Sequence, residues 1–264
     1  MDSATAVLHA LTSKPGAGLV MDFDGVLAPI TDDPTASELL PGTERLLARL
    51  AEHLSVVALL SGRPVGFLAE RAAIPGVELY GSYGLERLTS DGIEVLPEAR
   101  QWTAAVQEAT RMLHRELDGI EGVHVEDKSL AVAVHWRRAP DRDRAERLIA
   151  PLVQQVIEAQ GLRREPGKFV EELRMPIDQD KGTALERIIG AGSLQTLAYA
   201  GDDRGDLPAF RVVIAANGHA LVVDGPDMAP EVGSVPGVHF DGPDAFQGWL
   251  QQLDDALRSS QSPS

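Results

Sequence analysis

Cysteine is absent from the 264 residues of this chain. Disulfide bridges, thiolate zinc sites and cysteine nucleophiles are therefore excluded. The phosphate-binding loop G-x-x-x-x-G-K-[ST], the dinucleotide-binding G-x-G-x-x-G and the metalloprotease H-E-x-x-H are missing as well. A nucleotide-driven kinase or a zinc protease therefore has no support from the sequence.

Long apolar runs and an excess of basic residues are also lacking. No run approaches the roughly 18 apolar residues of a membrane span, and residues 1–16 lack the basic lead and apolar core of a signal peptide. We expect a cytoplasmic protein without a membrane partner, as a monomer or small homo-oligomer. The net charge of −16 argues against a nucleic-acid partner, because such binding neutralises phosphates with Lys and Arg. A small anionic substrate would need local basic residues and a metal to overcome this charge.

Apolar runs alternate with helical patterns at both ends of the chain. The run at 19–21 has no polar face, which is typical of a strand buried on both sides of a parallel sheet. With short links between elements, the alternation predicts an α/β fold with a doubly wound parallel sheet. Strands are expected at 19–21, 55–60, 77–80, 196–200 and 220–223, and helices at 4–12, 43–52, 65–72, 182–189, 207–213 and 245–257.

The middle of the chain has a different pattern. Residues 130–136 alternate large apolar with small or polar residues, as an antiparallel strand with one buried face does. We therefore predict an α/β unit with an antiparallel sheet at 86–174, inserted between two parts of the core at 1–85 and 175–264. Within the insert, strands are expected at 93–96, 123–126 and 130–136 and twice within 162–173, and helices at 99–117 and 141–159.

Polar side chains follow the predicted parallel strands at the points where the strands end. They are Asp22, Asp24, Ser61, Asp202 and Asp203, with Lys181 at the start of the helix that re-enters the core. The carboxyl ends of parallel strands meet at one edge of the sheet, where ligands bind in open α/β folds. Several carboxylates there suit Mg²⁺, which takes carboxylate, phosphate and water oxygens. The alternative is a turn at 24–25 with Asp22 as a local cap.

These residue types favour hydrolysis of a phosphate ester. A metal screens the charge of a phosphoryl group, so the carboxylate of Asp22 can attack it and form an acyl phosphate. Asp24 would protonate the departing alcohol oxygen and then take a proton from the attacking water. Ser61 and Lys181 would hold the non-bridging oxygens as charge develops.

Four segments, in order, resemble the motifs of the haloacid dehalogenase (HAD) superfamily. They are DFDGVLAPI at 22–30, SGR at 61–63, DKG at 180–182 and GDDRGD at 201–206. The resemblance implies a HAD-like core with Asp22 as nucleophile and Asp24 as acid and base, and with Ser61 and Lys181 on the phosphate. The Mg²⁺ ligands that it implies are Asp22, the backbone carbonyl of Asp24 and Asp202, with Asp203 alongside.

The insert is similar to that of the trehalose-6-phosphate phosphatases, in which it is a cap that closes over the sugar. The segments that carry this likeness are GSYGLER at 81–87, VEDKSLAVAVHWR at 125–137 and GKFVEELR at 167–174. The resemblance implies an enzyme that hydrolyses trehalose 6-phosphate, a small-molecule sugar phosphate, to trehalose. The substrate-binding residues are then expected to be Arg63 in the core and Glu126, Lys128, Lys168 and Glu172 in the cap, with His135 and Arg137 in the matching strand.

For several of these residues a structural role stays open. The alternatives are a solvated turn at 126–128, a structural role for His135, a surface ion pair worth under about 1 kcal/mol for Lys168 and Glu172, and a loop anchor for Arg63. Asp206 can cap the helix at 207 or orient Lys181, and we favour the second role. Glu165 and Glu171 are expected on a solvated face.

Several positions depart from the family pattern, among them Tyr83, Gly205 and Leu207. Tyr83 stands where the family usually has histidine, and Gly205 and Leu207 stand where it has threonine and glutamate. These changes leave the proposed catalytic groups in place but bear on the sugar specificity and the finer metal shell. The rival functions are a HAD phosphatase for another glycosyl or pseudo-disaccharide phosphate and a sugar phosphomutase. A non-enzymatic sugar-phosphate sensor is disfavoured, because Asp22 and Asp24 are both present.

Overall fold

The computed structural model describes residues 3–31, 34–191, 194–226 and 228–261. Its contacts divide the chain into two compact units, Met1–Glu94 with Gln179–Ser264, and Val95–Asp178. We call these the core unit and the inserted unit.

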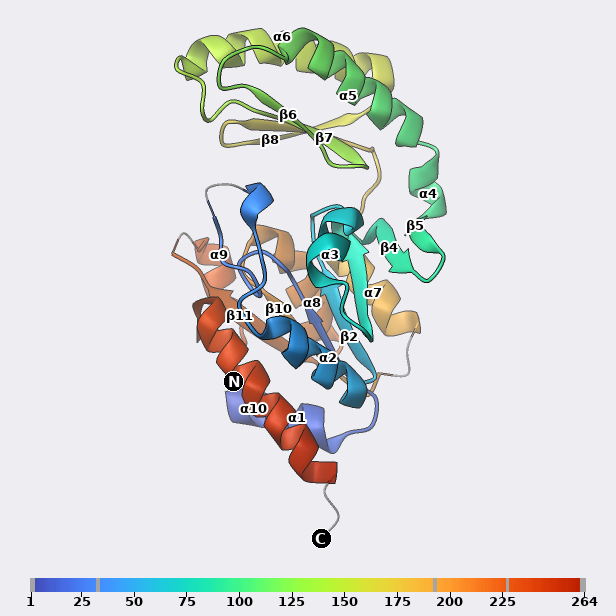
Figure 1. Ribbon diagram of the computed structural model, residues 1–264, viewed down its shortest axis with the longest axis vertical. Coiled ribbons are helices and arrows are strands. Elements are labelled where there is room, and N and C mark those ends of the chain that lie inside the picture. Colours follow the sequence, from blue (N-terminus) through green and yellow to red (C-terminus); the bar gives the residue numbers. More distant parts are fainter. Residues whose placement is uncertain (1–2, 32–33, 192–193, 227, 262–264) are drawn as a thin grey trace. The chain divides into compact units, whose positions relative to one another are not determined.

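The core unit is built on an eight-stranded sheet with the strand order β12-β11-β10-β1-β2-β3-β4-β5 (Figure 1). Neighbouring strands from β12 to β3 are parallel, and β4 runs antiparallel to β3. The strands span Ala17–Met21 (β1), Val56–Leu60 (β2), Val77–Gly81 (β3), Glu86–Thr89 (β4), Gly92–Val95 (β5), Thr196–Gly201 (β10), His219–Asp224 (β11) and Val238–Asp241 (β12). The predicted parallel sheet is confirmed.

Helices pack on both faces of this sheet. They span Ala4–Ser13 (α1), Thr43–His53 (α2), Val65–Ala72 (α3), Lys181–Ala191 (α7), Leu207–Ala215 (α8), Pro230–Gly233 (α9) and Gly242–Gln261 (α10). Short 3-10 helices lie in the connections at Pro34–Ala36 (η1), Ser82–Gly84 (η2) and Arg204–Asp206 (η3).

The strand β1 is central because both of its faces are apolar. All five residues of Ala17–Met21 are buried. Leu19 and Met21 belong to a core formed with α1, α2, α3 and α10, whereas Val20 belongs to a second core formed with α7 and α8. Since successive side chains of a strand point to opposite faces, one apolar run serves both cores.

The inserted unit is an antiparallel sheet with two long helices on one face (Figure 1). Its strand order is β6-β7-β9-β8, and α5 contacts β6 and β7 while α6 contacts β9. The elements span Pro97–Arg100 (α4), Thr103–Leu117 (α5), His124–Asp127 (β6), Ala131–His135 (β7), Arg142–Gln160 (α6), Arg163–Gly167 (β8) and Val170–Arg174 (β9). Val132, Val134 and Leu173 are fully buried in this unit.

The boundaries of the insert differ from those expected at 86 and 174. The contacts place them at Val95 and Asp178, because β4 and β5 extend the sheet of the core unit. The strand expected at 93–96 exists as β5 but joins that sheet. The helix expected at 99–117 is two helices, α4 and α5, which are separated at residues 101–102. Local patterns cannot report which sheet a short strand joins, since pairing is decided by tertiary contacts.

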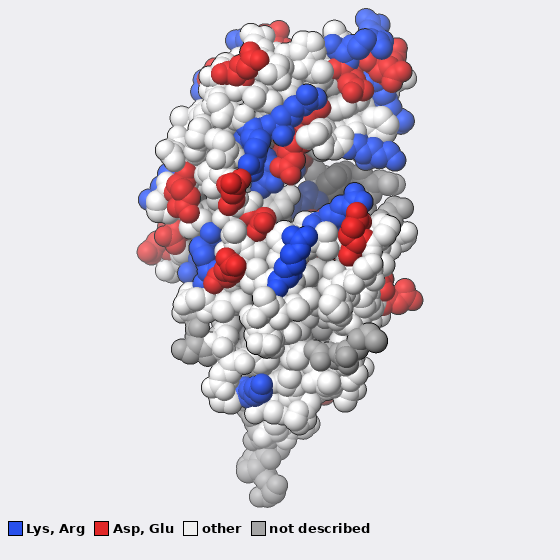
Figure 2. Space-filling view, turned by 180° about the vertical axis from the view of Figure 1, so that it is seen from behind, with Lys and Arg blue, Asp and Glu red and all other residues white. Residues whose placement is uncertain are grey.

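Acidic and basic side chains are interspersed on the face of the molecule shown in Figure 2. The acidic excess behind the net charge of −16 is therefore accompanied on that face by local positive charge. Among the described residues, every helix falls short of the length and apolar character that crossing a membrane requires.

Candidate active site

The carboxyl ends of β10, β1 and β2 lie side by side, because these strands are parallel neighbours. Asp22 directly follows β1, and its backbone N–H donates to the carbonyl of Ala200 on β10 (2.9 Å). Ser61 directly follows β2, and Asp202 directly follows β10. The sheet therefore brings these side chains to one edge.

Four carboxylates gather at this edge: Asp22, Asp202, Asp203 and Asp206. Each offers one oxygen, and these oxygens all lie within 4.8 Å of one another. Asp22 and Asp206 are buried, whereas Asp203 is exposed. Asp202 lies so close to the loop after Asp22 that a Cβ atom on Gly25 would be 2.0 Å from its Oδ2. Gly25, with φ +75°, is thus required by the cluster itself.

Lys181 is the buried cation of the cluster. It is the first residue of α7, and its Nζ donates to Asp22 Oδ2 (2.5 Å) and to Asp206 Oδ1 (2.7 Å). Burial by itself would lower the pKa of Lys181, but the carboxylates of Asp206 and Asp22 outweigh it and hold this pKa well above the ordinary value. Lys181 therefore carries a positive charge beside the proposed nucleophile.

Asp206 holds this arrangement together. Its Oδ1 accepts from Lys181 and from the hydroxyl of Tyr199 (2.5 Å), and its Oδ2 accepts from the backbone N–H groups of Asp202 (2.9 Å) and Asp203 (3.1 Å). Burial would raise its pKa, but Lys181 and these donors hold the pKa below the ordinary value. Asp206 thus orients Lys181. Its side chain closes the turn at η3 instead of capping α8.

The pKa values of two other carboxylates show how crowded the site is. Burial raises the pKa of Asp22 to about 7, although Lys181 opposes this effect. Burial, with the charges of Asp22 and Asp206, raises the pKa of Asp202 to about 9. A divalent cation would relieve this repulsion. An oxygen-only donor set also matches the ligand preference of Mg²⁺, so the residues present fit the expected ion.

Magnesium should stabilise the protein more at high pH than at low pH. A folded acid with a raised pKa binds more protons than the same acid unfolded, so the free energy of unfolding falls as pH rises from about 4 towards the raised values for Asp22 and Asp202. Mg²⁺ favours the ionised form and restores this stability. In thermal-shift measurements we expect a larger gain from Mg²⁺ near about pH 8 than near about pH 6.

The control for this measurement is Asp202→Asn, which removes one charge and one ligand. It should raise the melting temperature of the metal-free protein and reduce the effect of Mg²⁺. Sodium chloride at matched ionic strength corrects for screening. A gain that is the same at both pH values would contradict the assignment of the metal to these carboxylates.

Asp24 is not one of the four carboxylates of the cluster. It pairs with Arg63, whose Nε donates to Asp24 Oδ2 (2.7 Å). Ser61 is buried, and its Oγ accepts from the backbone N–H of Arg63 (3.2 Å). The core residues expected at the site are thus placed in two groups, one around Asp22 and one around Asp24.

One sheet face of the inserted unit carries most of the residues expected to bind sugar. The register aligns Glu126 with Ala133 and Ala133 with Glu172, so the two glutamates point to the same side. Lys128 Nζ donates to Glu172 Oε2 (2.7 Å), and His135 Nε2 lies 2.8 Å from Glu126 Oε2. We call Glu126, Lys128, His135 and Glu172 the polar sheet face.

Two other residues of the inserted unit lie differently from expectation. Lys168 lies in the turn between β8 and β9, and Glu172 pairs with Lys128, not with Lys168 as in the alternative of a surface ion pair. Glu171 points to the opposite face of the sheet, where it is buried and paired with Arg164. The expectation that Glu171 is solvated was wrong, because a strand turns neighbouring side chains to opposite faces.

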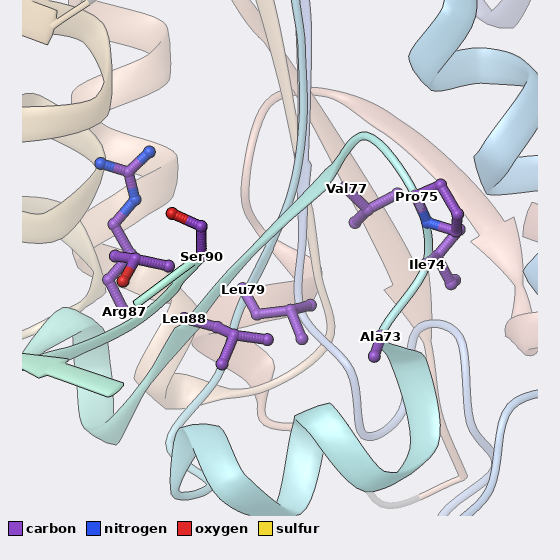
Figure 3. A pocket seen from close by; sticks show the side chains of 9 residues that line it. Ala73, Ile74, Pro75, Val77, Leu79, Arg87, Leu88 and Ser90 are labelled. Atoms are coloured by element: carbon purple, nitrogen blue, oxygen red, sulfur yellow. The ribbon is translucent and has the colours of Figure 1, made fainter. Parts of the chain in front are cut away.

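A groove of about 740 Å³ lies elsewhere on the core unit, beside the amino end of β3 (Figure 3). Ala73, Ile74, Pro75, Val77, Leu79, Arg87, Leu88, Thr89 and Ser90 line it. The residues expected at the site follow the carboxyl ends of the strands, so this groove is separate from the carboxylate cluster.

The core unit has a HAD-like fold, with the carboxylate cluster at the carboxyl ends of its parallel strands. A haloacid dehalogenase-like hydrolase from Bacteroides thetaiotaomicron superposes with a TM-score of 0.61 over 92% of this chain and 99% of its own, at 16% identity. The C-terminal domain of a trehalose-6-phosphate phosphatase from C. albicans gives a TM-score of 0.73, covering 96% of each chain at 19% identity.

The family follows from the sequence comparison. The trehalose-phosphatase family model matches residues 20–237, so the chain belongs to this family. A trehalose-phosphate phosphatase of Mycobacterium marinum is 38% identical over 215 residues, which are 79% of this chain and 54% of that protein. The chain spans about half the length of the curated relatives that it matches.

Proposed function

We propose that the chain is a Mg²⁺-dependent phosphatase that hydrolyses trehalose 6-phosphate to trehalose and phosphate. The observation that carries this proposal is the contact of Lys181 Nζ with Asp22 Oδ2 inside a group of four carboxylates at the strand ends. This arrangement offers a carboxylate nucleophile, a cation for phosphate oxygens and ligands for a metal. The family assignment and the 38% identity to a named trehalose-phosphate phosphatase support the substrate.

The metal would be held by Asp22, the backbone carbonyl of Asp24 and Asp202, with Asp203 alongside. When bound, Mg²⁺ screens the charge of the phosphoryl group and orients it. Asp206 would remain a positioning residue, since both of its oxygens already accept hydrogen bonds from the protein.

The reaction then has two steps. A carboxylate oxygen of Asp22 bonds to phosphorus while the bond from phosphorus to the sugar oxygen breaks, and Asp24 gives that oxygen its proton. In the second step a water oxygen bonds to phosphorus, Asp24 takes a proton from the water, and the bond to Asp22 breaks. Lys181 and Ser61 would stabilise the non-bridging oxygens in both steps.

The polar sheet face of the inserted unit would bind the sugar hydroxyls. Paired carboxylates and cations offer both acceptors and donors, which hydroxyl groups need. Lys168 in the neighbouring turn would add another donor. A different glycosyl phosphate remains the alternative, because Tyr83, which replaces the usual histidine, lies against the residue after Ser61. A Cβ atom on Gly62 would be 2.9 Å from the Tyr83 ring.

Phosphate release from a panel of sugar phosphates tests the substrate and the sheet face together. With Mg²⁺, we expect the highest kcat/KM for trehalose 6-phosphate among the phosphates of trehalose, glucose, sucrose and glucosylglycerate. Glu126→Ala and Glu172→Ala should each raise KM for trehalose 6-phosphate about 10- to 100-fold, since a hydrogen bond to a charged group contributes about 1.5–3 kcal/mol. Hydrolysis of 4-nitrophenyl phosphate should be nearly unchanged.

The matched control is Glu158→Ala, because Glu158 is an exposed glutamate on α6 of the same unit and bonds to Gln154. Glu158→Ala should leave kcat and KM unchanged for both substrates. Equal losses of kcat/KM on trehalose 6-phosphate and 4-nitrophenyl phosphate would contradict a sugar-binding role for Glu126 and Glu172. A higher kcat/KM for another sugar phosphate would replace the proposed substrate, and a bisphosphate requirement would indicate the phosphomutase.

A further inference from the structure

The carboxylate of Asp24 is held on both oxygens by two side chains outside the carboxylate cluster. Arg63 donates from Nε to Oδ2 (2.7 Å) and from Nη2 to Oδ1 (3.3 Å), and Ser37 donates from Oγ to Oδ1 (2.6 Å). A guanidinium that binds both oxygens fixes the plane of a carboxylate as well as its position. Ser37 is only 1% exposed, so its hydroxyl meets Asp24 inside the protein.

Arg71 fixes the segment that carries Ser37. This arginine lies on α3, and its Nε donates to the carbonyl of Ser37 (3.0 Å) while its Nη2 donates to the carbonyl of Thr35 (2.9 Å). The two bonds tie the residues around η1 to a rigid helix. The hydroxyl of Ser37 is therefore presented to Asp24 from a fixed backbone.

The ring of Phe67 supports both arginines. The guanidinium carbons of Arg71 and Arg63 lie 3.7 and 4.7 Å from its centre. Such cation–π contacts order long side chains that would otherwise lose more entropy when they bind. Phe67 also packs edge-on against Phe23, which precedes Asp24 in the chain, with ring centres 6.0 Å apart. One helix thus organises every partner of the Asp24 carboxylate named here.

We propose that Ser37 and Arg63 are positioning residues that aim the carboxyl group of Asp24 at the leaving oxygen of the substrate. The proposal rests on the phosphatase chemistry above but not on the identity of the sugar. It assigns Arg63 to Asp24 and not to the substrate. The hydroxyl of Ser37 can accept as well as donate, whereas a guanidinium only donates, so Ser37 can stay bonded to Asp24 while a proton is transferred.

Leaving groups of different basicity separate this role from a structural one. 4-Nitrophenolate departs readily without a proton, whereas phenol and sugar alcohols depend on the acid. With Mg²⁺, we expect Arg63→Ala to lower kcat for phenyl phosphate about 100-fold and Ser37→Ala about 10-fold, with KM nearly unchanged. The burst of 4-nitrophenolate from 4-nitrophenyl phosphate, recorded by stopped flow, should change far less. Arg63→Lys should recover only part of the loss, since an ammonium lacks the paired donors.

Arg87→Ala and Ser234→Ala are matched controls. Arg87 pairs with Glu78, and Ser234 donates to the carbonyl of Pro230, so both should behave as the unchanged protein does. Thermal unfolding verifies that each variant is folded. Equal slowing of phenyl phosphate turnover and of the 4-nitrophenolate burst, or a raised KM for both substrates, would overturn the proposal. The variants could slow phenyl phosphate far more than the 4-nitrophenolate burst in a protein that does not act on trehalose 6-phosphate. That result would support the positioning role and overturn only the proposed substrate.

Discussion

Asp22→Asn is expected to abolish phosphate release while leaving the fold intact. The amide has the shape of the carboxylate but cannot attack phosphorus, so the acyl phosphate does not form. Losing a nucleophile that works with an acid and a base costs on the order of 10⁴- to 10⁶-fold in kcat. Phosphate release with Mg²⁺, followed over hours at high protein concentration, measures this residual rate.

The fold should survive this change because the charge of Asp22 is not what stabilises it. Burial raises the pKa of Asp22 to about 7, which means that the buried site disfavours the ionised form. The amide oxygen can still accept from Lys181, which lies 2.5 Å from Asp22 Oδ2. The melting temperature of the metal-free variant should therefore equal or exceed that of the unchanged protein.

Asp254→Asn provides the matched control. Asp254 is as buried as Asp22 but lies on α10, where it accepts from Arg49 Nε (2.8 Å). It should keep its activity whatever its effect on stability. Acid-quenched protein should carry a phosphoryl group on Asp22 when that residue is present, as read by mass spectrometry. Substantial turnover by Asp22→Asn would contradict the assignment of the nucleophile.

The sequence was most informative where the residues of a single strand indicate how that strand is buried. The apolar run of β1 predicted burial on both faces, and the structure places Leu19 and Val20 in two different cores. Because β10, β1 and β2 are parallel neighbours, the residues after each strand had to meet. The grouping of Asp22 and Asp202 was predictable for this reason.

Sequence reasoning was weaker where a contact depends on two distant segments. Ser37 lies 13 residues from Asp24 in a segment with no motif, so no local signal predicted their bond. Arg63 was expected to bind substrate, with a loop anchor as the alternative, and nothing in the sequence indicated that its guanidinium pairs with Asp24. The position of β4 and β5 was missed for the same reason, since strand pairing is a tertiary choice.

Asp206 is the intermediate case. Its place in GDDRGD, four residues after Asp202, gave a signal for a carboxylate at the site, and we expected it to orient Lys181. The sequence could not reveal that the same carboxylate also accepts from the hydroxyl of Tyr199 and from two backbone N–H groups. Through these added bonds Asp206 holds the backbone of the loop after β10 in addition to orienting Lys181.

Asp206→Ala should therefore destabilise the protein more than the loss of any exposed carboxylate. The change removes one of the buried partners of the Lys181 charge. It also leaves the buried hydroxyl of Tyr199 without the carboxylate to which it donates. Breaking a buried ion pair by removing one partner costs about 3–5 kcal/mol. For a chain of this size, that corresponds to a fall of roughly 6–20 °C in melting temperature. Differential scanning calorimetry without metal measures it directly.

The comparison that isolates the buried network is Asp203→Ala, which removes the neighbouring but exposed carboxylate. Asp203 caps η3 by accepting from the backbone N–H of Gly205 (2.8 Å), so a smaller loss of about 0.5–2 kcal/mol is expected there. Asp206→Asn should restore little, because its amide N–H₂ would face the backbone N–H groups of Asp202 and Asp203, donor against donor. If Asp206→Ala and Asp203→Ala melted at the same temperature, the stability of the site would have to come from the carboxylate cluster as a whole. Asp206 would then be one charge among four and not the residue on which Lys181 depends.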